Sequence, residues 1–315
     1  MRSKRIILDV PEAMKKINPE SLSILERYIV DISMRNLSDN TRYAYERDLK
    51  HWFTYILLYQ DNKSVREIND EDICEFLYFC KREGNNSERL KRRTSSIAAL
   101  YKFMRKKRLI VENPTEFIDR PKKGLQVVQQ TFLTPDQVSL MREKLIESND
   151  TQFRLYAMLS LSTMARLSAI ASLRWDQVDL QNGIIKEVLE KEGKIVDLYF
   201  SEEVKYLLTK LKEERRLDGK DDYGWLFYTP KVTPVKHINK TTLGVWCKHI
   251  GELINVPSLH PHDFRHSGAT LLKNAGMALE DISVLLNHES TDVTKKFYIK
   301  ADTTRLSSIK RSYNI

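Results

Sequence analysis

The sequence predicts a mainly α-helical chain with one small β-sheet, organised as two domains. Apolar residues recur mostly at helical spacing, and only one stretch carries the pattern of a β-hairpin. The length of 315 residues fits two domains, each large enough to bury its own core. Hydrophobic residues at 41%, with only 10 Gly and 9 Pro, exclude disordered and collagen-like chains.

The N-terminal domain, residues 1–123, is expected to be helical. A start signal at Ser38 precedes a predicted helix over 41–58, whose apolar residues fall on one face. Two more helices are predicted over 70–80 and from 87 to about 107. Residues 124–130 follow as a predicted linker.

The C-terminal domain, residues 131–315, opens with Thr134 as a helix N-cap and Pro135 at the first helical position. Helical patterns continue to about Arg174. The segments 183–189 and 194–200 then predict a small hairpin, and helical patterns resume from Ser201.

The positive charge is concentrated in one segment. Residues 81–123 hold 14 basic and 5 acidic residues, a net +9 that equals the net charge of the whole chain. A Lys-rich solvated helix face is the ordinary explanation of such runs. Because one segment carries the entire excess, we favour binding of a polyanion, nucleic acid above all.

Other classes of protein are disfavoured. No apolar run approaches the ~20 residues of a membrane span, and the N-terminus lacks the apolar stretch of a signal peptide. Cys74, Cys80 and Cys247 have no C-x-x-C spacing, which predicts neither disulfides nor a zinc site. The histidines at 260, 262 and 266 lack a helical H-E-x-x-H pattern, so we expect no metal and no cofactor.

Four separated clusters hold residues able to carry chemistry. They are Arg166 with its neighbours, the hairpin turn with Lys191 and Lys194, the string 260–270, and residues 285–298. Each residue taken alone has an ordinary interpretation as a surface ion pair, a charged turn or a packed ring. Their order and spacing together make a site the better interpretation.

These clusters resemble those of the tyrosine recombinase (phage integrase) family. The most specific match is His262-x-x-Arg265-His266-x-x-Ala269-Thr270. The resemblance covers nearly the whole chain and implies a two-domain clamp on DNA, with a helical core-binding domain and an α+β catalytic domain. Together with the expected lack of a membrane span, a signal peptide and disulfides, it implies a location in the bacterial cytoplasm or nucleoid.

The resemblance implies a role for each candidate catalytic residue. Arg166 and Arg265 would bind the scissile phosphate, for which two guanidinium groups are chemically suited. His262 and His288 would contact the phosphate or move protons, and Tyr298 would attack the phosphorus. Lys191 would protonate the departing 5′ oxygen, with Lys194 as its nearest rival.

The sequence departs from the family pattern at supporting positions. Met164 stands where the family usually has Gly, and Asn287 replaces the Gly before the last His. Ala169 stands where the family has an acid that orients the first Arg. We therefore expect Arg166 to be poorly held.

The expected function is site-specific DNA cleavage and rejoining through a 3′-phosphotyrosyl intermediate. The alternative is a DNA-binding regulator, such as a phage repressor, that keeps the fold without cleavage; a type IB topoisomerase is a distant third. We expect a homodimer or homotetramer on double-stranded DNA, no membrane, and a C-terminal tail that packs on a neighbouring protomer or within its own chain. The residues expected to contact DNA are Arg89, Arg92, Arg93, Lys102, Arg105, Lys122 and Lys123.

Overall fold

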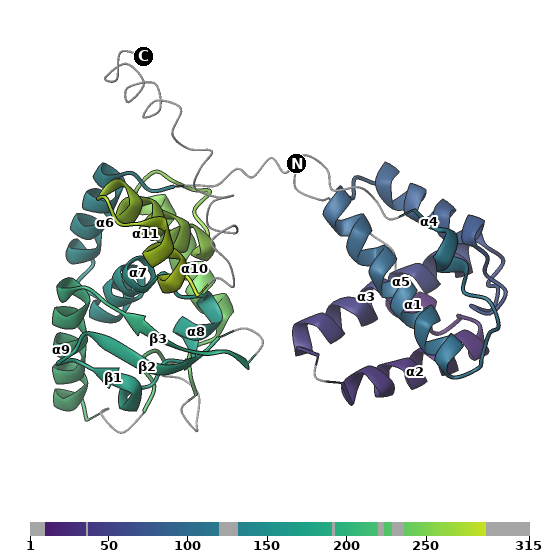
Figure 1. Ribbon diagram of the computed structural model, residues 1–315, viewed down its shortest axis with the longest axis horizontal. Helices are drawn as coiled ribbons and strands as arrows, with labels where there is room; N and C mark the ends of the chain where they lie inside the picture. Colours follow the sequence, from purple (N-terminus) through teal and green to yellow (C-terminus); the bar gives the residue numbers. More distant parts are fainter. Residues whose placement is uncertain are drawn as a thin grey trace, which may run out of the picture. The chain divides into compact units, whose positions relative to one another are not determined.

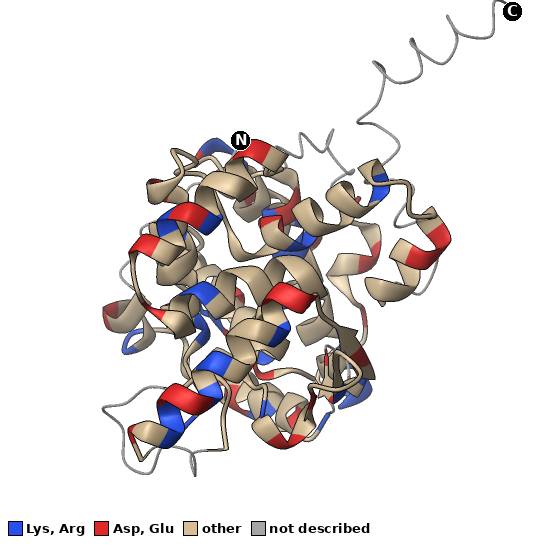
Figure 2. Cartoon of the chain, turned by 90° about the vertical axis from the view of Figure 1, so that its left-hand side faces the viewer, with Lys and Arg blue, Asp and Glu red and all other residues tan. Residues whose placement is uncertain are grey.

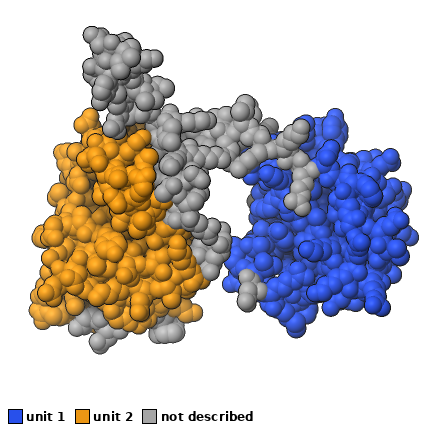
Figure 3. Space-filling model, in the orientation of Figure 1, with its two compact units in different colours: residues 1–128 blue, residues 129–315 orange. Residues whose placement is uncertain are grey.

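The computed structural model describes residues 10–35, 37–119, 132–190, 193–219, 224–228 and 236–287. The chain divides into two compact units, residues 1–128 and 129–315, coloured blue and orange in Figure 3. The predicted linker, residues 124–130, and the C-terminal tail, residues 306–315, whose packing was predicted, lie outside the described residues.

Unit 1 is built from helices (Figure 1). They are α1 (Val10–Met14), α2 (Pro19–Ser33), α3 (Asp39–Tyr59), α4 (Asp70–Arg82), α5 (Ser87–Lys106) and the short 3-10 helix η1 (Pro114–Phe117). The three helices predicted in this half correspond to α3, α4 and α5. Ser38 caps α3 as predicted, because its side chain accepts the N–H of Thr41 at 3.2 Å.

The core of unit 1 is aromatic. Trp52 on α3 packs edge-on against Tyr101 on α5, with ring centroids 5.9 Å apart, and both side chains are buried. The Tyr101 hydroxyl donates to the carbonyl of Val65 at 2.9 Å, so this buried polar group is satisfied. The α3–α5 pair is thereby fixed.

Unit 2 combines helices with one small sheet. Its elements are α6 (Pro135–Glu147), α7 (Thr151–Thr163), α8 (Leu167–Ala171), η2 (Trp175–Gln177), β1 (Val178–Asp179), β2 (Ile184–Leu189), β3 (Ile195–Tyr199), α9 (Glu202–Leu217), α10 (Lys240–Leu253), α11 (Pro261–Asn274) and α12 (Leu279–Leu285). The N-cap predicted at Thr134 is confirmed, since its side chain accepts the N–H of Gln137 at 3.2 Å.

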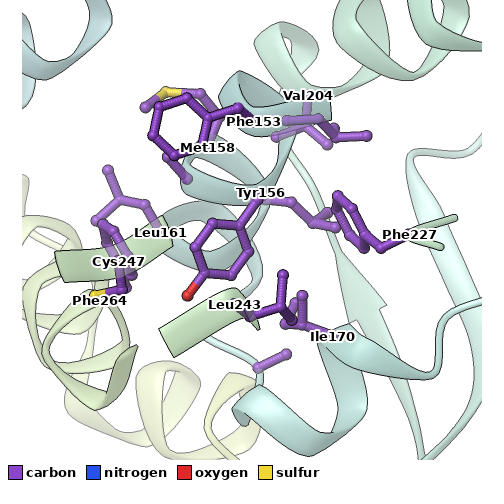
Figure 4. Packing of buried hydrophobic residues seen from close by; sticks show 14 of the residues in the cluster. Phe153, Tyr156, Met158, Leu161, Ile170, Val204, Phe227, Leu243, Cys247 and Phe264 are labelled. Atoms are coloured by element: carbon purple, nitrogen blue, oxygen red, sulfur yellow. The ribbon is translucent and has the colours of Figure 1, made fainter. Parts of the chain in front are cut away.

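Helix α7 runs through the core of unit 2 and contacts α6, α9, α10 and α11 (Figure 1). Figure 4 shows Tyr156 of α7 among Phe227, Leu243 and Phe264. Apolar residues cover nearly the whole circumference of α7, as expected of a helix enclosed on all sides. Helix α7 therefore holds in place the elements on which the candidate site residues lie.

The sheet is antiparallel, in the order β1-β2-β3. The predicted hairpin is β2 and β3, whereas β1 was not predicted. A register shift between Ile185 and Val188 marks a bulge, and Glu187 within it has a positive φ of 52°. The bulge changes which side chains of β2 face the core.

Figure 2 shows that positions of Lys or Arg and of Asp or Glu are interspersed along the helices. None of the described helices has the length and apolar character needed to cross a membrane.

Candidate DNA cleavage site

Arg166 lies in the short connection between α7 and α8. Its backbone is extended, with φ −69° and ψ 146°, and it is the N-cap of α8. Arg166 was predicted to lie within a helix, and this prediction is wrong. Helix α7 ends at Thr163, and the break lets the Arg166 side chain leave the core with 31% of its surface exposed.

Arg265 lies on α11 and is almost fully buried, at 3% exposure. Its Nη1 donates to the carbonyl of Met164 at 2.7 Å, and its Nη2 donates to the carbonyl of Leu286. Two main-chain oxygens from different elements therefore hold one guanidinium. Such bonds make burial of the charge tolerable and fix the direction of the planar group.

His262 is one helical turn before Arg265, on the same face of α11. Burial lowers the pKa of His262, and the positive charges of Arg265 and Arg166 lower that pKa further. The fold thus brings His262 and the two arginines together although Arg166 is far away in sequence. The His262 ring also meets His266 edge-on, with centroids 4.5 Å apart.

Arg166 has an acidic partner that was not predicted from the sequence. Glu190, directly after β2, accepts from Arg166 Nη1, and its Oε1 also accepts the Arg166 backbone N–H at 3.4 Å. Ala169 is fully buried in α8. The expectation that Arg166 is poorly held is therefore corrected: the acid comes from the hairpin instead of from α8.

The two departures from glycine keep the backbone conformation that glycine favours. Met164 has φ 55° and Asn287 has φ 51°, both in the left-handed region. Asn adopts this region readily, whereas for Met it costs roughly 1 kcal/mol. Met164 is 1% exposed and packs with Ile282 and Leu286, and this burial offsets the cost.

Lys194, just before β3, contacts the residue that follows α12 and its C-cap. The Nζ of Lys194 lies 3.5 Å from the carbonyl oxygen of Asn287, the residue before His288. Lys191, His288 and Tyr298 lie outside the described residues, so their roles stay predictions. Among the described residues, no group of three His, Cys, Asp or Glu side chains is arranged to hold a metal ion.

In unit 1, Arg93 is buried and Arg92 pairs with a buried aspartate. Arg93 is 1% exposed, and its Nε donates to Asn85 at 2.9 Å. Arg92 forms a bidentate pair with buried Asp48, at 2.7 and 2.8 Å. The expectation of direct DNA contact is therefore corrected for Arg93, because its guanidinium lies in the core. Arg92 pairs with Asp48 but keeps 33% of its side chain exposed, so its contact with DNA stays a prediction.

The exposed cations lie further along α5. Lys102, Arg105 and Lys106 line an open cavity of about 620 Å³, together with Glu116, which pairs with Arg105. Arg89 is half-buried, and burial together with the neighbouring Arg92 and Arg93 lowers its pKa. Lys122 and Lys123 lie outside the described residues.

Comparison with known proteins agrees with this geometry. Residues 131–305 match the model of the phage integrase family, and residues 25–108 match the phage integrase N-terminal SAM-like domain. A tyrosine recombinase XerC of Pseudomonas savastanoi pv. phaseolicola is 28% identical over 291 residues, covering 90% of this chain and 93% of the relative.

Two solved structures share the fold. The Tn1549 transposon integrase in complex with circular intermediate DNA has a TM-score of 0.69 at 18% identity, covering 91% of this chain and 98% of the other. A lambda integrase dimer bound to a COC′ core site has a TM-score of 0.66 at 17% identity, covering 90% and 96%. With the family model matched over more than half of its length, the chain belongs to the phage integrase family of tyrosine recombinases.

Proposed function

We propose that this chain is an active site-specific recombinase, which cuts and rejoins double-stranded DNA through a covalent bond to Tyr298. The observation that carries the proposal is the convergence of Arg166, His262 and Arg265, drawn from two segments about a hundred residues apart. The relatives are named as tyrosine recombinases, enzymes that break and rejoin DNA.

The two guanidiniums suit the charge that develops on a phosphate during its cleavage. Each presents several N–H donors in one plane, and those of Arg265 are already oriented by two carbonyls. Donors held in place before the reaction stabilise the non-bridging oxygens of the transition state without further reorganisation. Arg166 and Arg265 are assigned this role.

The covalent step balances with the residues of this chain. The Tyr298 hydroxyl oxygen attacks the phosphorus, and the bond from phosphorus to the 5′ oxygen breaks. The hydroxyl proton goes to His262, because the lowered pKa leaves the imidazole ring neutral near pH 7 and therefore able to act as a general base. Lys191 gives a proton to the departing 5′ oxygen, and His288 donates to the phosphate. Rejoining reverses these transfers, so no external energy source is needed.

Unit 1 is assigned the role of binding the DNA backbone. Lys102 and Lys106 are exposed on α5 and supply charge for phosphate contacts. We further propose that the protein acts as a dimer or tetramer on DNA in the bacterial cytoplasm or nucleoid. Lambda integrase, which shares the fold, has been solved both as a dimer on a core site and as a tetramer on a Holliday junction.

The test begins with DNA that the full chain selects from a random-sequence duplex pool. The selected duplex is then nicked near the cleavage point. After cleavage, the short fragment between the nick and the cleavage point diffuses away, so rejoining is prevented and the covalent product accumulates. We expect a protein–DNA adduct that survives denaturing electrophoresis, and mass spectrometry should place the DNA on Tyr298. Tyr298→Phe should abolish the adduct and leave the affinity nearly unchanged, because the hydroxyl adds little to backbone binding.

Tyr313→Phe is the matched control, since it removes a hydroxyl from the same C-terminal segment and should keep the adduct. Absence of an adduct with wild-type protein on a tightly bound duplex would refute the proposal. In that case the chain would be a DNA-binding regulator built on the recombinase fold.

A further inference from the structure

We propose that Glu190 is a positioning residue for Arg166 and supplies from the β2–β3 hairpin the negative charge that is missing at Ala169. This inference rests on the proposed function, because its effect is read on DNA cleavage. The acid would orient Arg166 for the scissile phosphate without touching the DNA itself.

Glu190 is held in place through its backbone and binds Arg166 at two points. Its backbone N–H donates to the carbonyl of Lys194 at 2.7 Å and closes the hairpin turn. Its side chain is 0% exposed, and its two carboxylate oxygens bind the side chain and the backbone N–H of Arg166. One carboxylate therefore fixes both the guanidinium and the main chain from which it extends.

Because the Glu190 carboxylate is buried, it requires a cation as its partner. A carboxylate removed from water is costly unless a cation and hydrogen-bond donors compensate it, and Arg166 provides both. Arg166 is 31% exposed, so the guanidinium is paired on one side and accessible on another. A guanidinium has five N–H donors, which leaves enough of them for a phosphate.

Position 169, where the family carries the acid, has no room for a carboxylate in this chain. Ala169 is 0% exposed and belongs to the main hydrophobic cluster of unit 2. A carboxylate introduced there would need space among packed apolar side chains. The hairpin is thus the element that provides the acid in this chain.

Glu190 is also the residue immediately before Lys191, the assigned proton donor. A single hairpin turn would then align the arginine that stabilises the phosphate and carry the lysine that protonates the leaving group. The arrangement adds a negative charge beside the anionic substrate. Removal of that charge is therefore expected to slow cleavage without weakening DNA binding.

The experiment compares Glu190→Gln with wild type in the full chain on the selected, nicked duplex. Glutamine keeps the shape and removes the charge. We expect the single-turnover rate of adduct formation to fall about 10- to 100-fold, the scale that a displacement of about 1 Å causes, while the dissociation constant for DNA is unchanged or lower. Glu187→Gln is the matched control, since it removes the same charge from an exposed position on β2 and should keep the rate.

Thermal unfolding supplies a second measurement that does not depend on cleavage. In wild type, Glu190→Gln should lower the melting temperature, because it breaks the pair. In an Arg166→Ala background the same substitution should raise it, because a buried carboxylate without its cation is removed. This reversal of sign is expected only if the two side chains act on each other.

The outcomes separate this inference from the proposed function. If wild type forms the adduct and Glu190→Gln forms it at the same rate, Glu190 does not position Arg166. A faster rate would also overturn the inference and would make Glu190 a restraint on Arg166. If wild type forms no adduct, the proposed function fails, and the sign of the melting shift alone decides whether Glu190 holds Arg166.

Discussion

Gly268 lies where α11 crosses α7, and replacing it with alanine tests whether that close approach sets the geometry of Arg265. A Cβ atom at Gly268 would lie 2.3 Å from the carbonyl oxygen of Leu161 and 2.8 Å from the Cγ of Met164. Ordinary contact begins at 3.4 Å, so α11 must move by about 1 Å. The obstacle is a main-chain oxygen, which cannot swing aside as a flexible side chain does.

The magnitude follows from this displacement. Overpacking of a core typically costs 1–3 kcal/mol, so we expect the unfolding free energy to fall by about 2 kcal/mol. For a unit of this size that corresponds to a melting temperature lower by roughly 4–8 °C. Arg265 lies one turn before Gly268 and binds the Met164 carbonyl at 2.7 Å. A shift of about 1 Å there should lower the cleavage rate by up to ~100-fold.

Two other glycines, both on α10, separate stability from catalysis. Gly251→Ala produces a similar clash, with Val256 O at 2.5 Å and Leu259 Cβ at 2.9 Å, and should lower the melting temperature with less effect on the rate. Gly244→Ala meets nothing within 4 Å and should stabilise the helix by about 0.5–1 kcal/mol. Calorimetry and the adduct assay measure both quantities. If Gly268→Ala retains wild-type stability and rate, the close approach does not position Arg265.

Three further predictions concern charge. Asp48→Asn should lower the unfolding free energy by about 3 kcal/mol in denaturant titration, because it leaves two arginines without their buried anion. The lowered pKa of His262 means that the folded protein binds a proton less readily than the unfolded chain. Stability from this group is therefore present above about pH 6.5 and is lost as the pH falls below it, so His262→Gln should flatten the decline in melting temperature between about pH 7 and 5. Lys102→Ala should reduce the slope of log affinity against log salt by up to ~0.9, whereas an unchanged slope would remove Lys102 from the phosphate contacts.

Helical periodicity and capping residues predicted much of the fold. The starts of α3 and α6 follow from Ser38 and Thr134, whose side chains satisfy N–H groups of the first turn. The two-residue strand β1 was missed because so short a segment has no periodicity. The position of Arg166 was missed because the helical pattern continues past Thr163, although Met164 ends α7 in a left-handed conformation.

The burial of Arg93 could have been predicted from the sequence. It lies four residues before Ile97 and seven before Leu100, on the apolar stripe of α5, and both residues are buried there as Arg93 is. Its charge suggested an exposed side chain, whereas its position in the helical period indicates a buried one.

Glu190 could not be found from the sequence alone. An acid on the inward face of a strand signals a buried partner, but the bulge at Glu187 shifts the alternation of β2. Only after that shift does Glu190 fall on the buried side with Val188. Its partner, 24 residues earlier, is brought near by tertiary folding.

The two arginines of the site differ in how easily mutation can misalign them. Met164 and Leu286, whose carbonyls bind Arg265, are the C-caps of α7 and α12. Helix C-termini carry a partial negative charge of roughly half an elementary charge each, so the pair together offsets much of the guanidinium charge. Carbonyl groups belong to the main chain, and no single side-chain substitution deletes them. The alignment of Arg166 depends on one carboxylate, which a single substitution of Glu190 removes. The alignment of Arg265 is lost only when the backbone itself moves, as we expect for Gly268→Ala.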